Sequence, residues 1–222
     1  MSSLPSFTHT TRLRLIVLGC SFFALIYSGI GGHPIREVMQ APMIGLDTQI
    51  PWLPWTVIIY LSQYVFLLLA VLYSPNQRIA TQTYYGYLLA TLLAGCIFIL
   101  YPTQLPRVFL PQQDTHLVIY YLYQFLYFSD TPYNCFPSLH TTLALFALIS
   151  LKQRNAFWQI VAPLWGFAII LSTLTTKQHC LLDVLAGMLL FLLCIGLYQK
   201  VFDERVNGAI ASQNYTDTTV RS

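Results

Sequence analysis

Charged side chains are scarce in this sequence, and that scarcity excludes an ordinary water-soluble domain. Asp, Glu, Lys and Arg make up 9% of the 222 residues, against roughly 25% in soluble domains. The mean hydropathy of +0.59 agrees. The net charge is only +3, and its basic residues are divided between loops, so the sequence gives no argument for nucleic-acid binding. We therefore expect an integral membrane protein that has the lipid bilayer, and no nucleic acid, as a partner.

The cysteines are scattered along the sequence, and their positions exclude the common metal sites. The five cysteines have none of the short spacings at which paired ligands hold a metal ion, so we expect no metal and no other cofactor. Cys135 and Cys180 differ from the rest because each lies near a histidine of interest. The sequence leaves open whether these two form a disulfide.

Long apolar runs, by contrast, are abundant. They are continuous and lack the alternation of membrane-barrel strands, so we expect an all-α polytopic membrane protein. Its single domain covers residues 1–222, with six transmembrane helices in a bundle and a loose cytoplasmic tail at 203–222. The predicted spans are residues 13–30, 55–73, 84–101, 136–151, 156–176 and 181–202.

Two segments need separate treatment in this plan. The fourth span is short, but Pro137 suits the first turn of a helix, and Lys152 and Arg154 can extend to the head groups at its end. The tyrosine-rich run at 116–128 is too short to span. We expect it to form a short interfacial helix between the third and fourth spans, over the outer side of the bundle.

The distribution of basic residues predicts the orientation. In a six-span plan one side holds eight Lys and Arg residues and the other holds three. The richer side is predicted to be cytoplasmic, which places both termini inside and the loops at 31–54, 102–135 and 177–180 outside. The compact length favours a bacterial inner membrane, and nothing in the sequence indicates the oligomeric state. The three basic residues of the outer side are Arg36, Arg107 and Lys177.

Polar residues gather at the predicted outer face, where they are costly and therefore informative. They come from three loops that are far apart in the sequence. The plan brings two cations, two histidines, hydroxyl groups and one carboxylate to the same depth. These residues are Arg107, Ser138, His140, Ser172, Lys177, His179 and Asp183.

The spacing of these residues suggests a phosphate site. His179 and Asp183 share a helix face if the last span begins near Gln178, and the carboxylate then orients the imidazole. A helix beginning near Pro137 directs the free amides of the next residues, Ser138 to His140, towards an anion. With the two nearby cations, such a site favours a dianionic group such as phosphate.

Two sequence segments resemble signature motifs of the type 2 phosphatidic acid phosphatase superfamily. "PSLH" at 137–140 resembles its second motif, P-S-x-H, and "STLTTKQHCLLD" at 172–183 resembles its third, which is S-R, five residues, H, three residues, D. The resemblance covers residues 101 to 187. Thr173 stands where the family has arginine, and Lys177 is a candidate to replace it. The first motif is reduced to Arg107 in "YPTQLPR", without a lysine upstream in register.

The leucine in "PSLH", together with "IPWLPW" at 50–55 and "TKQH" at 176–179, is similar to the branch that includes inositol phosphorylceramide synthases and many bacterial relatives. This resemblance implies a two-step phosphoryl transfer without a metal. His179 attacks phosphorus, Asp183 orients it and His140 protonates the leaving oxygen. The implied phosphate-binding groups are Arg107, Lys177, Ser172 and the amides of Ser138 and Leu139.

Three functions are left open. The first is a lipid phosphatase acting on a phosphomonoester or pyrophosphate of a phospholipid or polyprenyl lipid at the extracytoplasmic face. The second is a phosphotransferase that moves a phospho-head-group between lipids. The third is a redox carrier in which His140 and His179 bind haem. A catalytically inactive scaffold is a further alternative, because the family's arginine and lysine are missing.

Overall fold

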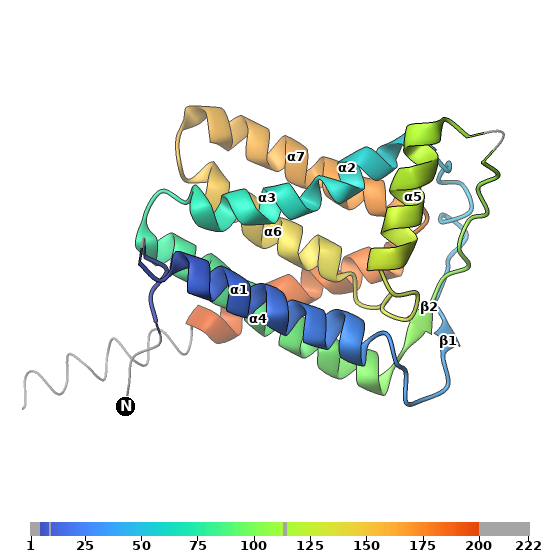
Figure 1. Cartoon of the computed structure of the whole chain (residues 1–222), viewed down its shortest axis with the longest axis horizontal. Helices are drawn as coiled ribbons and strands as arrows, with labels where there is room; N and C mark the ends of the chain where they lie inside the picture. The colour runs from blue at the N-terminus through green and yellow to red at the C-terminus, as the bar shows by residue number, and fades with distance from the viewer. Residues whose placement is uncertain (1–4, 9, 113–114, 200–222) are drawn as a thin grey trace, which may run out of the picture.

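The computed structural model describes residues 5–8, 10–112 and 115–199, and it consists of a bundle of helices with one helix across its end (Figure 1). The helices are α1 (Arg12–Ala24), α2 (Val57–Leu61), α3 (Gln63–Leu72), α4 (Gln77–Leu100), α5 (Leu117–Ser129), α6 (Leu139–Lys152) and α7 (Ala156–Thr175). A last described helix, Leu181–Gln199, lies beside them. The short elements are the π-helical η1 (Leu25–Ile30), the 3₁₀ η2 (Pro54–Thr56), β1 (Met39–Gln40) and β2 (Thr103–Gln104).

Five of the predicted membrane spans have helices of sufficient length and apolarity to cross a bilayer. Within the described residues they are Arg12–Gly29, Pro54–Leu72, Gln77–Leu100, Ala156–Thr175 and Leu181–Gln199. The chain is therefore a multi-pass membrane protein of mainly helical structure. The predicted end of the sixth span at 200–202 and the predicted tail at 203–222 lie outside the described residues.

The fourth predicted span is helical but shorter than the other five. α6 has 14 residues, of which ten are buried, and it packs against α3, α4 and α7. Small residues such as Ala144 and Ala147, both 0% exposed, allow these neighbours to approach closely. α6 is thus the centre of the bundle, and protein rather than lipid covers most of it.

The third predicted span begins earlier than its hydropathy indicated. α4 starts at Gln77 rather than at residue 84, because the Asn76 side chain accepts a hydrogen bond from Ile79 N at 3.0 Å and caps the helix. The second predicted span is interrupted at Ser62, whose hydroxyl donates to Ile59 O at 2.6 Å and accepts from Trp165 Nε1 at 2.8 Å. This break separates α2 from α3.

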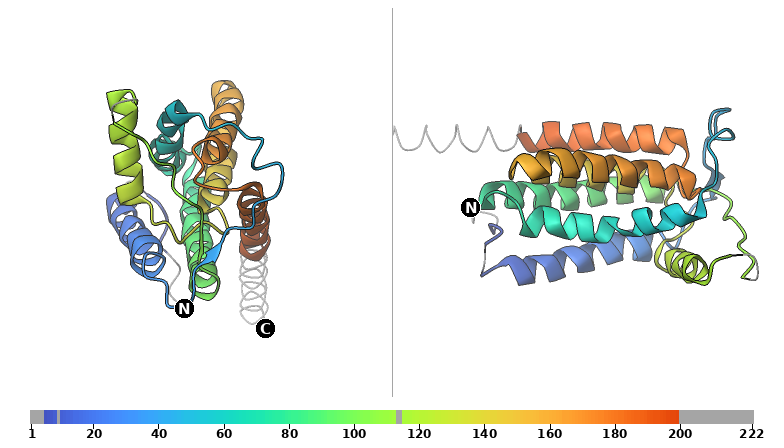
Figure 2. Two further views of the ribbon diagram at one scale, coloured as in Figure 1. Left: turned by 90° about the vertical axis from the view of Figure 1, so that its right-hand side faces the viewer. Right: turned by 90° about the horizontal axis from the view of Figure 1, so that it is seen from above.

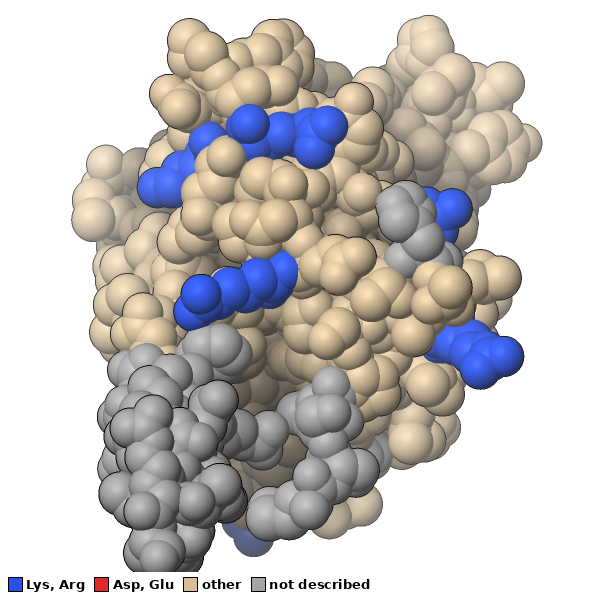
Figure 3. Space-filling view, turned by 90° about the vertical axis from the view of Figure 1, so that its left-hand side faces the viewer, with Lys and Arg blue, Asp and Glu red and all other residues tan. Residues whose placement is uncertain are grey.

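The two ends of the bundle differ in character. One end carries α5, which lies roughly across the bundle axis, and the β1–β2 pair (Figures 1 and 2). At the other end lie the start of α1 and the turns that join α3 to α4 and α6 to α7. Figure 3 shows this second end, where Lys and Arg are visible and Asp and Glu are not. The segment at 116–128, which was predicted to be an interfacial helix, is helical as α5 and lies at the opposite end from these basic residues.

Candidate active site

His140 lies in the first turn of α6, at the end of the bundle that carries α5. Ser138 is the N-cap, and its hydroxyl oxygen accepts from Thr141 N at 3.3 Å. The helix therefore begins at Leu139, and Pro137 precedes the cap instead of occupying the first turn as expected. The Ser138 amide donates to Asp183 O at 3.0 Å, so it is not the free donor that was predicted. Among the described residues, the amides of Leu139 and His140 have no acceptor.

His179 lies in the turn between α7 and the last described helix. Lys177 adopts a left-handed conformation, with φ at 59°. Its amide donates to Leu174 O at 3.2 Å, and the amide of Gln178 donates to Thr173 O at 3.0 Å. This is the hydrogen-bond pattern of a Schellman motif at a helix end. The His179 amide also donates to Thr173 O, at 3.1 Å. Thr173, which replaces the family arginine, thus helps to fix His179 through its main chain.

Asp183 lies beside His179 but contacts it differently from the prediction. The last helix begins at Leu181 and not near Gln178, so the two residues do not share a helix face. Instead, Asp183 Oδ2 accepts from Cys180 N at 2.9 Å, capping the helix, and lies 3.5 Å from His179 Nδ1. Within the described part of the chain, His179 Nδ1 and Asp183 Oδ1 have no aligned hydrogen-bond partner. Catalytic hydrogen bonds are often this long before substrate binds.

The two histidines face each other although 39 positions separate them in the sequence. Their ring centroids are 5.6 Å apart, and the ring planes are inclined by 57°. His140 is 9% exposed, His179 5% and Asp183 0%. Contact between the last helix and α6 makes this arrangement possible, since Thr142 Oγ1 donates to Gly187 O at 2.8 Å.

Asp130 is a buried acidic residue of the site that the sequence reasoning did not identify. It directly follows α5 and accepts hydrogen bonds from Tyr27, on η1, and from Tyr60 Oη, on α2, the latter at 2.6 Å. Tyr60 Oη also lies 3.4 Å from His140 Nδ1. The sequence gives only a weak indication of this role. Asp130 is one of eight acidic residues in the whole sequence, and it lies in a loop of the predicted outer side.

The predicted cations lie near His179, and main-chain oxygens hold both. Arg107 donates to Tyr127 O at 2.9 Å and to Asp130 O at 2.5 Å. Lys177 Nζ donates to Asp47 O at 3.1 Å and to Ile50 O at 2.6 Å. Both cations and His179 line a small cavity of about 20 Å³, which has room for a water molecule but not for a phosphate.

Ser172 has a different environment from the other predicted phosphate ligands. Its hydroxyl donates to Ile169 O of its own helix at 2.6 Å, and the residue is 2% exposed. It does not line the small cavity that His179 shares with Arg107 and Lys177. The Ser172 side chain thus bonds to the main chain of α7 near the end of that helix.

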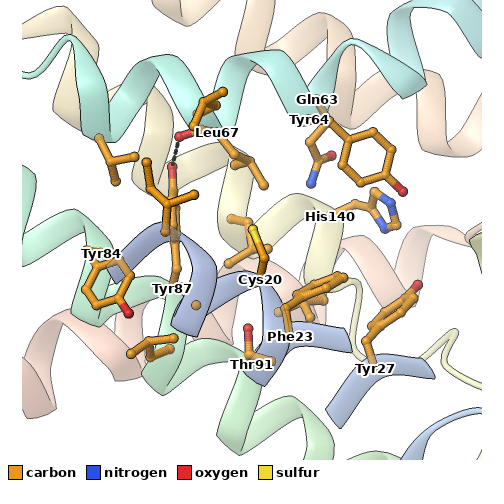
Figure 4. Close-up of a pocket in the computed structure, with 17 residues that line it drawn as sticks. Cys20, Phe23, Tyr27, Gln63, Tyr64, Leu67, Tyr84, Tyr87, Thr91 and His140 are labelled. Carbon is orange, nitrogen blue, oxygen red and sulfur yellow. Dashed lines mark hydrogen bonds between the residues drawn. The ribbon is translucent and has the colours of Figure 1, made fainter. Parts of the chain in front are cut away.

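A large apolar cavity reaches His140 from the side of the bundle. Its volume is about 310 Å³, and it lies between α1, α3 and α4 (Figure 4). Apolar side chains such as Phe23, Leu67 and Leu143 line most of it. Gln63 and Tyr64 lie close to His140 at one end, as Figure 4 shows. Gln63 is 4% exposed, and its Oε1 has no partner among the described residues.

Cys135 and Cys180 lie together beside the site as free thiols. Both are buried in one small apolar cluster with Ala41. Burial raises the pKa of the Cys135 thiol, and burial together with the charge of Asp183 raises the pKa of Cys180 to about 12. In the structure both cysteines are free, and no disulfide joins them.

These features define a class of protein, a helical membrane protein with a buried pair of imidazoles and a carboxylate at one end of its bundle. The chain belongs to the PAP2 superfamily, whose family model matches residues 48–197, more than half of its length. This confirms the superfamily that the "PSLH" and "STLTTKQHCLLD" motifs indicated. Members of the superfamily are phosphoric-ester hydrolases or phosphotransferases, so the chain is of the phosphatase or phosphotransferase type that acts on lipids. Comparisons with curated proteins and with solved structures gave no significant match.

Proposed function

We propose that the protein is a lipid phosphatase that hydrolyses a phosphomonoester or pyrophosphate of a phospholipid or polyprenyl lipid. The observation that carries the proposal is the pair of facing imidazoles, with ring centroids 5.6 Å apart and Asp183 beside His179. A nucleophile next to a carboxylate and a second imidazole opposite it are the groups that a two-step displacement at phosphorus needs.

In the first step His179 Nε2 attacks phosphorus, since Nδ1 faces Asp183. The bond from phosphorus to the ester oxygen breaks, and that oxygen takes a proton from His140. The lipid alcohol leaves, and a phosphohistidine remains on His179. Asp183 stabilises the positive charge that develops on the imidazole.

In the second step water attacks the phosphohistidine, and His140 accepts a proton from that water. The bond from phosphorus to nitrogen breaks, which returns both histidines to their initial states and releases phosphate. A second lipid alcohol in place of water gives the phosphotransferase, as in the inositol phosphorylceramide synthase-like branch. The same residues serve both reactions.

We assign phosphate binding to Arg107, Lys177 and the amides of Leu139 and His140. The carbonyl oxygens that accept from the two cations leave their charges in place. Within the described residues no carboxylate pairs with either cation. Since the cavity between them is small, the segments that bear them must separate when a phosphate enters. Ser138 then acts as the helix cap, and Ser172 supports the end of α7.

The apolar cavity beside His140 supports a substrate with a hydrocarbon chain. It extends between α1, α3 and α4 to the imidazole of His140, so a hydrocarbon chain that lies along it brings its head group to the two histidines. Substituting Leu143 by Gln should raise KM for a long-chain substrate and leave KM for a water-soluble phosphate ester unchanged.

We further propose that α6 is a sixth, buried span, that α5 lies at the membrane interface, and that the active site faces the extracytoplasmic side. The basic residues at the opposite end support this orientation. A bacterial inner membrane suits this compact architecture.

The decisive experiment uses the purified protein in lipid nanodiscs with phosphatidate, phosphatidylglycerol phosphate and a polyprenyl diphosphate, each with and without a lipid alcohol. We expect phosphate release from one of them without the alcohol, and no turnover by the His179→Ala variant. Product formed only when the lipid alcohol is present would overturn the hydrolase in favour of the phosphotransferase. Turnover by His179→Ala at the wild-type rate would overturn both.

A further inference from the structure

His140 has polar contacts of its own, separate from the pair formed by His179 and Asp183. Tyr60 Oη lies 3.4 Å from His140 Nδ1, and the two ring centroids are 4.6 Å apart. The Tyr60 hydroxyl donates its proton to Asp130 Oδ2 at 2.6 Å. Its oxygen is therefore free to accept from His140 Nδ1–H. The three residues form a chain that leads from imidazole to hydroxyl to carboxylate.

Asp130 is well suited to end this chain. It is 8% exposed, and both of its carboxylate oxygens accept from tyrosine hydroxyls, Oδ1 from Tyr27 and Oδ2 from Tyr60. Arg107 donates to the main-chain oxygen of Asp130 at 2.5 Å, which holds the segment after α5 in place. A buried carboxylate with fixed donors is an anion of defined position.

We propose that Asp130, acting through Tyr60, is a positioning residue that keeps His140 in the tautomer and charge state of a general acid. The inference rests on the proposed function, because it assumes that His140 transfers a proton. With Nδ1–H directed at Tyr60, Nε2 is left for the site, where it gives its proton to the leaving oxygen. Asp130 stabilises the imidazolium form that precedes this transfer.

Each imidazole thus has one carboxylate as a partner, and the two carboxylates lie at different distances from their imidazoles. Asp183 lies next to His179, and Asp130 acts on His140 across a hydroxyl. Two equal environments would give the histidines equal proton affinity, whereas the reaction needs one to be neutral and the other protonated. Among the described residues, the titratable groups that face His140 or share its cavity are Cys20, Tyr27, Tyr60, Tyr64, Tyr84, Tyr87, Asp130, His179 and Asp183.

The test compares Asp130→Asn with the wild-type protein. Asparagine keeps an oxygen that accepts from Tyr60 but lacks the charge. We expect kcat/KM to fall by about 10- to 100-fold, which is part of the ~10²–10⁴ that general acid catalysis supplies. His140 must be protonated to act, so its loss of a proton sets the alkaline limb of the kcat/KM profile. Without the negative charge that limb should move to lower pH by about one unit. The acid limb should stay in place.

Two tyrosine variants provide a matched pair. Tyr60→Phe and Tyr27→Phe each remove one donor to Asp130, but only Tyr60 lies within hydrogen-bond range of His140 Nδ1. Tyr60→Phe should move the alkaline limb in the same direction as Asp130→Asn, and Tyr27→Phe should leave that limb in place. Asp130→Glu, which restores the charge, should return the limb towards its wild-type position.

The outcomes separate this inference from the proposed function. An inactive wild-type protein, or an active His179→Ala, would contradict the proposed function itself. If His140→Ala is impaired while Asp130→Asn and Tyr60→Phe keep the wild-type pH profile, Asp130 has no positioning role. A loss of kcat in both variants without a shift of one limb, at unchanged melting temperature, also overturns the inference. Size-exclusion elution and melting temperature verify that each variant is folded.

Discussion

At the scale of single residues, Lys177 combines a strained backbone with a charged side chain in the candidate site. A left-handed conformation disfavours a residue with a Cβ by about 1–2 kcal/mol, and here φ is 59°. Two hydrogen bonds from Nζ to carbonyl oxygens hold the side chain. Strain retained by such contacts is typical of functional sites. The backbone and the charge of this residue can be tested separately.

Two substitutions separate the effect of the charge from that of the backbone, and these are Lys177→Met and Lys177→Gly. Both variants lack the cation, so turnover should fall by roughly 10²-fold in each, the usual effect of removing one group that stabilises transition-state charge. Glycine also relieves the strain, so Lys177→Gly should be more stable than Lys177→Met by about 1 kcal/mol. Assays and thermal melts measure the two effects. Lys152→Met, at the far end of α6, is the control, and equal activity of all three variants would exclude Lys177 from phosphate binding.

Cys180 provides a second test at this scale. With a pKa of about 12, its thiolate fraction at pH 8 is about 10⁻⁴, roughly 10³-fold below that of an ordinary thiol. We expect iodoacetamide to modify Cys180 at least that much more slowly in the folded protein than after denaturation, measured by mass spectrometry at pH 8. Rapid labelling in the folded state would show that the turn between α7 and the last helix opens.

The residue scale also shows what the sequence could reveal of the site. Spacing identified His140, His179 and Asp183, because the motifs keep these residue types at fixed separations. The partners of His140 could not be found in this way. Tyr60 and Asp130 lie in different segments, and only the packing of α2 against α5 brings them together.

At the scale of elements, the last described helix lies close to the start of α6 at Gly187. A Cβ at this position would meet the main-chain oxygen of Ser138, the N-cap of α6. The Ser138 amide donates to Asp183 O at 3.0 Å. The absence of a side chain at Gly187 therefore sets the separation of the two elements that carry His140 and Asp183.

Gly187→Ala should separate these two elements and impair both folding and activity. A methyl group forced against the main chain is an overpacking substitution, which typically destabilises by about 1–3 kcal/mol. Gly196 in the same helix is the matched control, because a Cβ there meets nothing within 4 Å. Gly196→Ala should be neutral or stabilising, by up to about 1 kcal/mol. Equal melting temperatures for the two variants would contradict the close approach.

The elements also show why hydropathy alone predicted the presence of the helices better than their boundaries. Continuous apolar runs indicated all the long helices. The start of α4 was missed because its first turns are polar, and the cap at Asn76 lies outside the apolar run. α6 was expected to be a short span at 136–151. The helix observed is slightly shorter still, with 14 residues, and neighbouring helices rather than lipid cover most of it.

At the scale of the whole molecule, most of the described basic residues lie at the end of the bundle opposite the two histidines. The start of α1 and the turns before α4 and α7 share one end. Basic residues of these segments are Arg12, Arg14, Arg78, Lys152 and Arg154. The two histidines lie near the other end, with α5 and the β1–β2 pair. If the basic end is cytoplasmic, a substrate of this enzyme must present its phosphate on the outer side.

Labelling from outside the cell tests this orientation. Gly45 in the loop after β1 and Gln153 in the turn after α6 are both exposed, and β1 and the turn after α6 lie at the two ends of the bundle (Figure 1). Each residue is replaced by Cys in a background that lacks the exposed Cys20 and Cys96. A membrane-impermeant maleimide should label Gly45→Cys in intact cells, and Gln153→Cys only after permeabilisation. The reverse pattern would place the site in the cytoplasm, where the enzyme would act on lipids of the inner leaflet. The control is a soluble cytoplasmic thiol, which must stay unlabelled in intact cells. If both positions were labelled under that condition, the two ends of the bundle could not lie on opposite sides of the membrane.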